Sequence, residues 1–185
     1  MSKAHYVAPA AVLVEDARTV RLGSAGNKFT SVDAYKFVKL AAESEYDLCA
    51  AGDPIESVVV SVDTAPSQNF SVGSIVDDGV LFVIADGLQA TPGTGTMAVG
   101  DYVVCGTVTA RNTALAAGMP KVCKATEQPG AAVTTADNVV GNINAAIAKV
   151  VAQGKNAMFA WRVESLGTAG TGAVGTQIAI KRVNG

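Results

Sequence analysis

The sequence predicts a mainly β fold: a β-barrel or β-sandwich domain with one α-helix, at about residues 136–152, and an extended N-terminal arm. Valine supplies 27 of the 185 residues, and alanine and glycine supply 32 and 19 more, whereas leucine-rich helical stretches are absent. Valine favours strands, and alanine and glycine suit places where backbones approach closely. Short valine-rich runs and turn residues alternate at intervals of roughly 8–12 residues, which is typical of a barrel or sandwich.

The first part of the chain predicts an arm and not a folded unit. Residues 1–30 contain Pro9, Gly23 and Gly26 and have too little periodicity to form a core of their own. Such a segment can be disordered, or it can lie extended on a neighbouring molecule by β-addition. We expect the second, because the segment is apolar, and we place the β-rich domain at residues 31–185.

Residues 31–50 are compatible with two structures. A helix would begin after Thr30 or Ser31 as its cap and would place several apolar side chains on one face. Alternatively, strands over residues 35–41 and 46–49 would flank a turn. We expect the two strands.

The central part of the chain carries the clearest strand pattern. Strands are expected at residues 55–62, 70–76, 80–85, 102–109 and 120–125. The sequence Asp77-Asp78-Gly79 predicts a hairpin between the second and third of them, because glycine supplies the positive φ that a tight turn needs. A further Asp-Gly pair, Asp86-Gly87, is expected to end the third strand.

One stretch repeats apolar residues with helical spacing. The residues that recur every four positions are Val139, Ile143, Ile147 and Val151. This spacing predicts the helix at about 136–152, and Gly154 follows as a left-handed stop. We expect this helix to pack on one face or end of the β-domain.

The last part of the chain predicts two strands around a glycine-rich turn. Trp161 and Val163 share the inward face of the first strand, and the final strand can close a sheet or barrel. Residues 170–175 match the pattern GxGxxG, but a dinucleotide-binding loop must be followed by a helix. A β-like run follows here, so the segment is expected to be a hairpin loop.

Charge and hydropathy exclude several partners. The formal net charge is −2 and no basic cluster exceeds the pair Lys181-Arg182, so no nucleic-acid partner is expected. No apolar run approaches the roughly 18 residues of a membrane helix, so we expect no membrane association. No secretory signal is evident, so we expect synthesis in a cytoplasm. Hydrophobic residues make up 49% of the chain. The surplus apolar surface predicts burial at subunit interfaces.

The residues that carry chemistry are few. Cys49, Cys105 and Cys123 each lie in an apolar or β-like context and are expected to be buried, reduced thiols. His5 is the single histidine and lies in the arm, so a catalytic Ser/His or Cys/His arrangement is not expected. The aspartates lie beside or near glycine or proline, as in turns, and no calcium-loop spacing occurs. We therefore expect no catalytic residue, no metal, no cofactor and no enzyme activity.

Four stretches combine into a recognisable pattern: residues 36–62, 79–87, 97–107 and 159–185. They include a G-D strand entry, a W-R-V strand and a terminal I-x-I-x-R-V strand. In these features the chain resembles the head decoration proteins of tailed bacteriophages, also called capsid cement or stabilising proteins, over most of residues 35–125 and 158–185. The resemblance implies a β-rich domain, commonly a homotrimer, bound to the outside of a capsid. It also implies that the N-terminal arm contacts the major capsid protein or a neighbouring subunit.

The function expected from this resemblance is that of a structural virion protein on the capsid surface, made in the host bacterial cytoplasm, which stabilises the shell by bridging capsomers. The candidate capsid contacts in the arm are Tyr6, Val7, Val12, Leu13 and Val14. An alternative is a phage adhesin or tail-associated glycan-binding protein, but the inward position expected for Trp161 argues against an aromatic glycan platform. A third hypothesis is a small β-barrel enzyme, which would need a polar, carboxylate-lined pocket.

Overall fold

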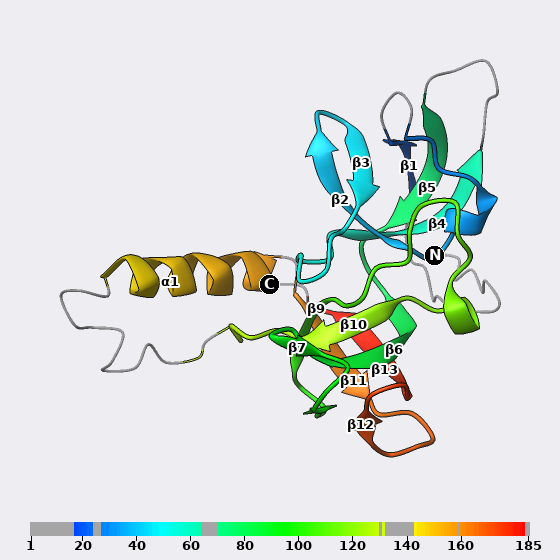
Figure 1. Ribbon diagram of the computed structural model, residues 1–185. Coiled ribbons are helices and arrows are strands. Elements are labelled where there is room, and N and C mark those ends of the chain that lie inside the picture. The colour runs from blue at the N-terminus through cyan, green and yellow to red at the C-terminus, as the bar shows by residue number, and fades with distance from the viewer. Residues whose placement is uncertain are drawn as a thin grey trace, which may run out of the picture.

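The computed structural model describes residues 17–23, 27–63, 70–129, 131, 143–158 and 160–183. Thirteen β-strands and one α-helix lie in this part of the chain. The strands form two small barrels, one above the other in Figure 1, and helix α1 (Ile143–Met158) extends to one side. The predicted mainly β barrel fold with one helix is confirmed.

The first five strands form the N-terminal barrel: β1 (Ala17–Leu22), β2 (Phe37–Ala42), β3 (Glu45–Leu48), β4 (Ser57–Asp63) and β5 (Ser71–Val76). Their order is β1-β3-β2-β4-β5, and β5 returns to β1. The β1–β3 pair is parallel and the other four pairs are antiparallel. Because side chains alternate along each strand, apolar residues such as Leu22, Val38 and Ile75 point into the barrel, where they are fully buried.

Five of the later strands form the C-terminal barrel: β6 (Val80–Leu88), β9 (Tyr102–Cys105), β10 (Lys121–Lys124), β11 (Trp161–Ser165) and β13 (Gln177–Arg182). They pair in the order β6-β10-β9-β11-β13, and β13 returns to β6. The β6–β10 pair is parallel and the rest are antiparallel. Three strands of two residues each extend the loops: β7 (Thr91–Pro92), β8 (Thr96–Met97) and β12 (Gly172–Ala173).

The two barrels therefore repeat one topology. In chain order, β1 to β5 correspond to β6, β9, β10, β11 and β13. In each barrel the first and third strands form the parallel pair, and every other neighbour is antiparallel. The chain builds the same five-strand arrangement twice in succession.

One apolar core joins the barrels. Trp161 is fully buried, and its indole Nε1 donates a hydrogen bond to the carbonyl oxygen of Ile55 at 3.1 Å. The predicted inward orientation of Trp161 and Val163 is confirmed. Residues from both barrels share this core, among them Phe37, Val58, Val83 and Ile178. The two barrels are thus one packed body.

The predicted arm of residues 1–30 is wrong for residues 17–22 and for Phe29. Residues 17–22 form β1, and all six of them pair with β5, from Ala17 opposite Val76 to Leu22 opposite Ser71. Phe29, also placed in the arm, is fully buried in the N-terminal barrel. Strand β1 closes the barrel, because without it β3 and β5 would be the unpaired edges of an open sheet.

The hairpin predicted at Asp77-Asp78-Gly79 is also wrong. The local turn forms: Gly79 has a φ of 110°, and the Asp78 carboxylate accepts a hydrogen bond from its amide at 2.7 Å. The flanking strands do not pair, because β5 belongs to one barrel and β6 to the other. In addition, β6 does not end at Asp86-Gly87 but continues to Leu88.

The remaining strand predictions hold in outline. Residues 31–50 form the antiparallel strands β2 and β3, and Thr30 precedes only a short 3-10 turn at Ser31–Asp33. The strand expected at 102–109 is shorter, because β9 ends at Cys105. Strands β11 and β13 form the expected C-terminal hairpin, and β12 in its glycine-rich loop pairs with β8.

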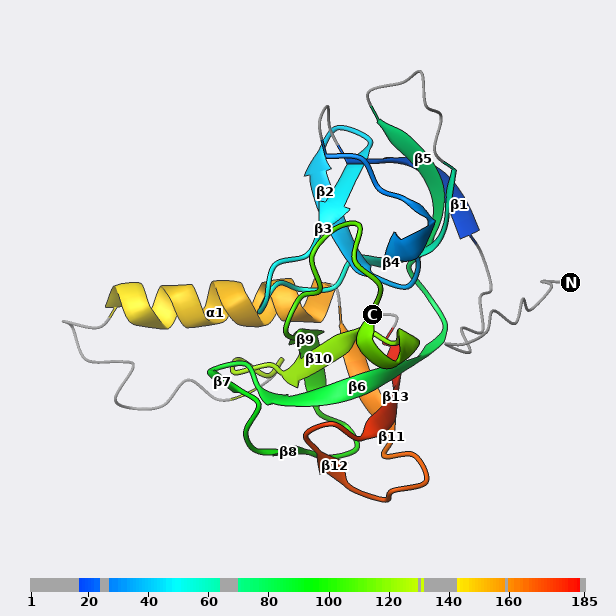
Figure 2. The same cartoon turned by 45° about the vertical axis from the view of Figure 1, so that its right-hand side comes forward.

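Helix α1 differs from its prediction in its end and in its packing. It continues through Gly154 to Met158, whereas the predicted residues 136–142 lie outside the described residues. It does not lie flat on a barrel: Figures 1 and 2 show it projecting sideways from the level where the two barrels meet.

Candidate interaction surface

The arm residues predicted to contact a capsid all lie outside the described residues. This set comprises Tyr6, Val7, Val12, Leu13 and Val14. Within the described part of the chain, the feature that most resembles a contact surface is helix α1.

Polar contacts anchor α1 through its C-terminal half. The Asn156 side-chain amide donates to the Glu127 carbonyl at 2.8 Å, and that of Gln153 donates to the Ala131 carbonyl at 2.9 Å. The Arg182 guanidinium, which belongs to β13, donates to the Met158 carbonyl at 3.2 Å. A cation at the last carbonyl also complements the negative end of the helix dipole. A hollow of about 200 Å³ remains between this part of α1 and the barrel loops.

Four large apolar side chains of α1 point away from the body. Ile147 is 56% exposed, Val150 53%, Val151 51% and Met158 70%. With Gly154 they follow the spacing i, i+3, i+4, i+7, i+11, which places them on one helical face. We call these five residues the α1 stripe. The half-buried positions, such as Ala152 and Asn156, lie on the opposite face.

This arrangement reverses the usual orientation of an amphipathic helix. A surface helix normally buries its apolar stripe against the core and exposes its polar face. Here the described contacts of α1 with the body come from polar and small residues, whereas the four large side chains of its stripe are exposed. Four of the nine large hydrophobic residues exposed in the described part of the chain belong to this one helix. Such clustering marks an interaction surface.

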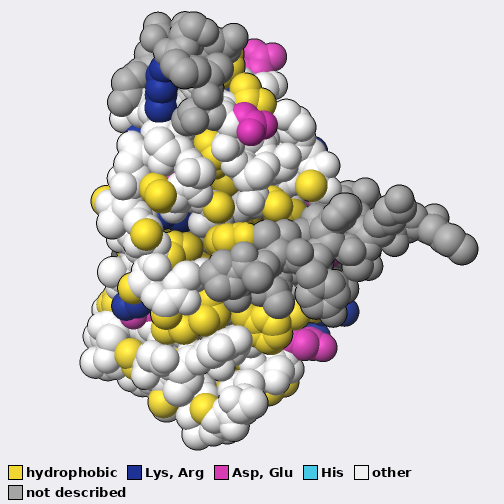
Figure 3. Space-filling model, turned by 90° about the vertical axis from the view of Figure 1, so that its right-hand side faces the viewer, with side chains coloured by type: hydrophobic (Ala, Val, Ile, Leu, Met, Phe, Trp, Pro, Cys, Tyr) yellow, Lys and Arg dark blue, Asp and Glu magenta, His cyan; other side chains and the backbone are white. Residues whose placement is uncertain are grey.

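Hydrophobic surface also occurs away from α1. Figure 3 shows the side of the molecule turned away from the helix, and hydrophobic side chains gather there in a band at the level where the barrels meet. The other large exposed hydrophobics of the described chain are single residues: Val32, Leu40, Val99, Val108 and Val174.

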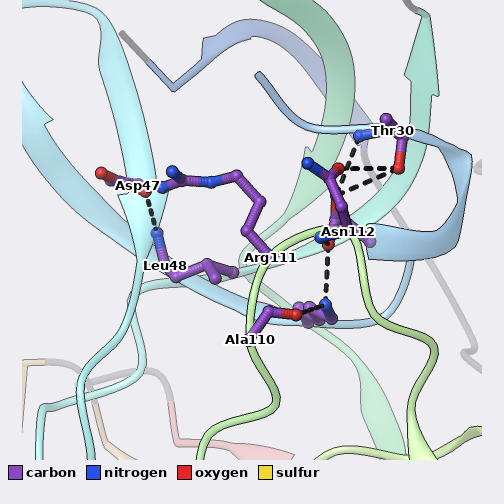
Figure 4. Close-up of polar contacts among 8 residues, drawn as sticks. Thr30, Asp47, Leu48, Ala110, Arg111 and Asn112 are labelled. Carbon is purple, nitrogen blue, oxygen red and sulfur yellow. Dashed lines mark hydrogen bonds and ion pairs between the residues drawn. The ribbon is translucent and has the colours of Figure 1, made fainter. Parts of the chain in front are cut away.

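A buried polar cluster links the two barrels. Asp33 and Lys36 form an ion pair at 2.7 Å with side chains 0% and 3% exposed. The backbone amide of Asn112, on the loop between β9 and β10, donates a hydrogen bond to the Asp33 carboxylate at 2.8 Å. The Lys36 ammonium donates to the Ala110 carbonyl at 2.6 Å. In Figure 4 the loop residues Ala110, Arg111 and Asn112 reach the N-terminal barrel. These groups bind one another, so the cluster acts as a structural lock.

Arg111 adds a second attachment for the same loop. Its guanidinium lies over the Phe29 ring, 5.0 Å from the centroid, and forms an ion pair with Asp47. Figure 4 shows it extended towards Asp47 and Leu48. The ring and the carboxylate thus fix the position of the guanidinium, although its buried Nε has no hydrogen-bond partner among the described residues.

The three cysteine thiols are buried, and two of them have raised pKa values. Cys49, Cys105 and Cys123 are free and buried, as predicted. A hydrogen bond with Cys105, together with burial, raises the pKa of Cys49 well above its usual range, and burial raises the pKa of Cys123 to about 11. A thiol with a raised pKa is a poor nucleophile because little thiolate is present.

Asp86 is a second buried carboxylate with internal partners. Its Oδ2 accepts hydrogen bonds from the Thr107 amide at 2.8 Å and the Thr107 hydroxyl at 2.5 Å, and Lys121 reaches Oδ1 at 3.3 Å. Burial alone would raise the pKa of Asp86, but the bonds from Thr107 and Lys121 bring it below its usual value. Asp86 is therefore held as a charged acceptor and is not poised as an acid.

The hollows of the described surface do not form a catalytic pocket. One hollow, about 570 Å³ on the N-terminal barrel, includes Arg18 and Arg21 among its lining residues. Arg18 pairs with Asp77 at 3.2 Å and Arg21 with Glu45 at 3.4 Å, so both charges are balanced. A crevice between the barrels encloses only about 20 Å³, which is room for about one water molecule.

Three further kinds of feature are absent from the described residues. No group of three or more His, Cys, Asp or Glu side chains among them is placed to hold a metal ion. No helix within the described ranges has the length and apolar character to cross a bilayer. None of the aromatic side chains that the structure describes is an exposed residue.

Comparisons with known proteins add no identification. No protein-family model, no curated protein and no solved structure matches the chain.

Sequence reasoning had found the apolar periodicity of α1 but not its orientation. The periodicity shows that one face is apolar, but it does not show whether that face points inward. A signal was present in the composition of the other face, which carries alanine, asparagine, glutamine and lysine and has no large apolar residue to bury.

Proposed function

We propose that this chain is a structural virion protein that binds the outer surface of a phage capsid and stabilises the shell by bridging capsomers. The observation that carries the proposal is the outward-facing α1 stripe on a body whose strands are closed into barrels. A stripe that contributes nothing to its own core is suited to contact with another macromolecule. The resemblance to head decoration proteins supplies the class of partner, the major capsid protein.

The construction of the body supports a mechanical role. The two barrels share one core around Trp161, and the Asp33–Lys36 lock ties the long loop of one barrel to the other. A body held together in this way can transmit force between the capsomers that it contacts, because its two barrels do not move apart easily. Each contact stabilises in proportion to the apolar area it buries, at about 25 cal/mol per Å² before the cost of association. Many symmetric copies then multiply a modest contact over the shell.

The same observations favour a binding protein over the two alternatives. An enzyme would use a poised acid, base or nucleophile, whereas the candidate groups Cys49, Cys123 and Asp86 are buried and held by internal partners. A glycan-binding adhesin would use an exposed aromatic platform, whereas Trp161 lies at the centre of the core.

The test uses empty capsids assembled without this chain. Purified full-length protein is added, and bound protein is measured by co-sedimentation and by cryo-electron microscopy of the decorated shells. We expect saturable binding at symmetric positions on the outer surface, a higher melting temperature of the shell, and a homotrimeric native mass. Absence of binding, or binding that leaves the shell no more stable, would refute the proposal.

A further inference from the structure

We infer that the α1 stripe docks in a preformed groove of the major capsid protein, and that this groove has an apolar floor and an acidic rim. The inference rests on the proposed function and specifies which surface of this chain makes the contact. Three properties of α1 carry it: the direction of the stripe, the area of the stripe, and the charge of the helix.

The direction of the stripe makes it available to a partner. Ile147 and Val151 lie near the middle of α1, and both are more than half exposed. The contacts that fix the helix come from Gln153, Asn156 and the Met158 carbonyl, in its C-terminal half. The helix is therefore held at the end next to the barrels, and the rest of α1 projects beyond them, as Figure 1 shows.

The area of the stripe favours a groove over a second copy of the same helix. A helix of 16 residues is about 24 Å long. Four aliphatic side chains that are 51% to 70% exposed offer on the order of a few hundred Å² of apolar surface. A stable dimer buries about 800 Å² on each partner, so two such stripes face to face are too small to hold two copies together. A groove contacts both flanks of a helix as well as its stripe, and the lattice supplies many such sites together.

The charge of α1 indicates the rim of that groove. Lys149 and Lys155 are its charged residues, and the helix contains no Asp or Glu. Lys155 is exposed and lies four positions after Val151, on the flank of the stripe that borders the hollow between α1 and the barrel loops. A second α1 would bring lysine without any acidic partner, whereas carboxylates around an apolar floor would pair with Lys155 and fix the direction of docking.

The experiment compares matched helix variants on empty capsids that lack this chain. The variant Ile147→Asp/Val151→Asp places two charges on the stripe. The control Ala145→Asp/Ala148→Asp adds the same charges at exposed positions outside the stripe. A third variant, Lys155→Glu, reverses the charge beside the stripe. Circular dichroism and urea unfolding show whether each variant retains the fold, which we expect because every substituted side chain is exposed.

We expect the stripe variant to lose about 100-fold in affinity for the capsids, as for a central apolar contact. The control should stay close to the unmodified protein. Lys155→Glu should bind about tenfold more weakly and with a reversed dependence on salt. If the unmodified protein binds capsids and the folded stripe variant binds equally well, the inference fails while the proposed function stands. If the unmodified protein does not bind, both fail.

Two further outcomes would overturn the inference by identifying another occupant. Native mass spectrometry would show a second copy if the stripe variant alone dissociated a wild-type oligomer into monomers. Flotation with phosphatidylserine vesicles would show a lipid surface if the unmodified protein bound and the stripe variant did not. We expect neither result, because the stripe is small and carries one adjacent lysine.

Discussion

Replacement of Lys36 by methionine tests whether the Asp33–Lys36 pair holds the barrels together. Lys36 is 3% exposed and Asp33 is 0% exposed, and Lys36 makes two short contacts, to the Asp33 carboxylate at 2.7 Å and to the Ala110 carbonyl at 2.6 Å. In Lys36→Met the Asp33 charge stays buried without its cation. Breaking a buried pair in this way costs about 3–5 kcal/mol, a large share of the stability of a domain of this size. We therefore expect the free energy of unfolding to fall by that amount.

Urea unfolding followed by Trp161 fluorescence measures this loss, because Trp161 is the single tryptophan and is fully buried in the core shared by the barrels. The control is Asp33→Asn/Lys36→Met, which leaves no buried charge and keeps an oxygen to accept the Asn112 amide. It should be more stable than Lys36→Met by at least about 1 kcal/mol. A loss below about 1 kcal/mol in the single variant, or a double variant no more stable than the single one, would refute the reasoning.

Three further predictions concern other parts of the fold. Deletion of residues 2–16 should leave cooperative unfolding intact, whereas deletion of residues 2–22 removes β1 and should abolish it, as seen by circular dichroism. Gly172→Val should destabilise the chain by about 1–3 kcal/mol in thermal unfolding, because a Cβ at this position would lie 2.1 Å from the Met97 carbonyl oxygen; unchanged stability would contradict the close β8–β12 pairing. The lowered pKa of Asp86 means that its charge stabilises the fold above the unfolded pKa, near 4, and that this contribution is lost as the pH falls through the folded value. Asp86→Asn should therefore flatten the acid side of the stability–pH curve, and an unchanged curve would show that Asp86 makes no such contribution.

The β1 segment shows where local sequence was insufficient. Val20 and Leu22 alternate as in a strand, but the run is short and is followed by Gly23 and Gly26, so it was assigned to the arm. Its place in the barrel depends on β3 and β5, which lie 23 or more residues further along the chain. A short stretch of sequence does not show which distant segment it will pair with.

At the Asp77-Asp78-Gly79 segment the local conformation was predicted correctly, but the strand pairing was not. The turn was predicted correctly as a backbone conformation, since Gly79 has a positive φ. The prediction that this turn connects two paired strands was wrong, because a tight turn joins paired strands only when their neighbouring edges are free. Here β1 and β4 occupy the edges of β5, and β10 and β13 occupy those of β6.

Of the candidate surface, only its periodicity could be predicted. The four-residue spacing that includes Ile147 and Val151 was correct, as were the buried thiols and the inward Trp161. The direction of the α1 stripe depends on which face finds hydrogen-bond partners, namely the Glu127 and Ala131 carbonyls on the loop that follows β10.

The amino-acid sequence alone determined the strand-rich class of this protein, the apolar face of its helix and the lack of clustered basic charge, because these follow from composition and from spacing along a short stretch. The tertiary structure decided that the strands close into two barrels of one topology and that the apolar face of α1 points outward. Both outcomes depend on which distant backbone groups satisfy one another, and that selection is made only when the whole chain packs.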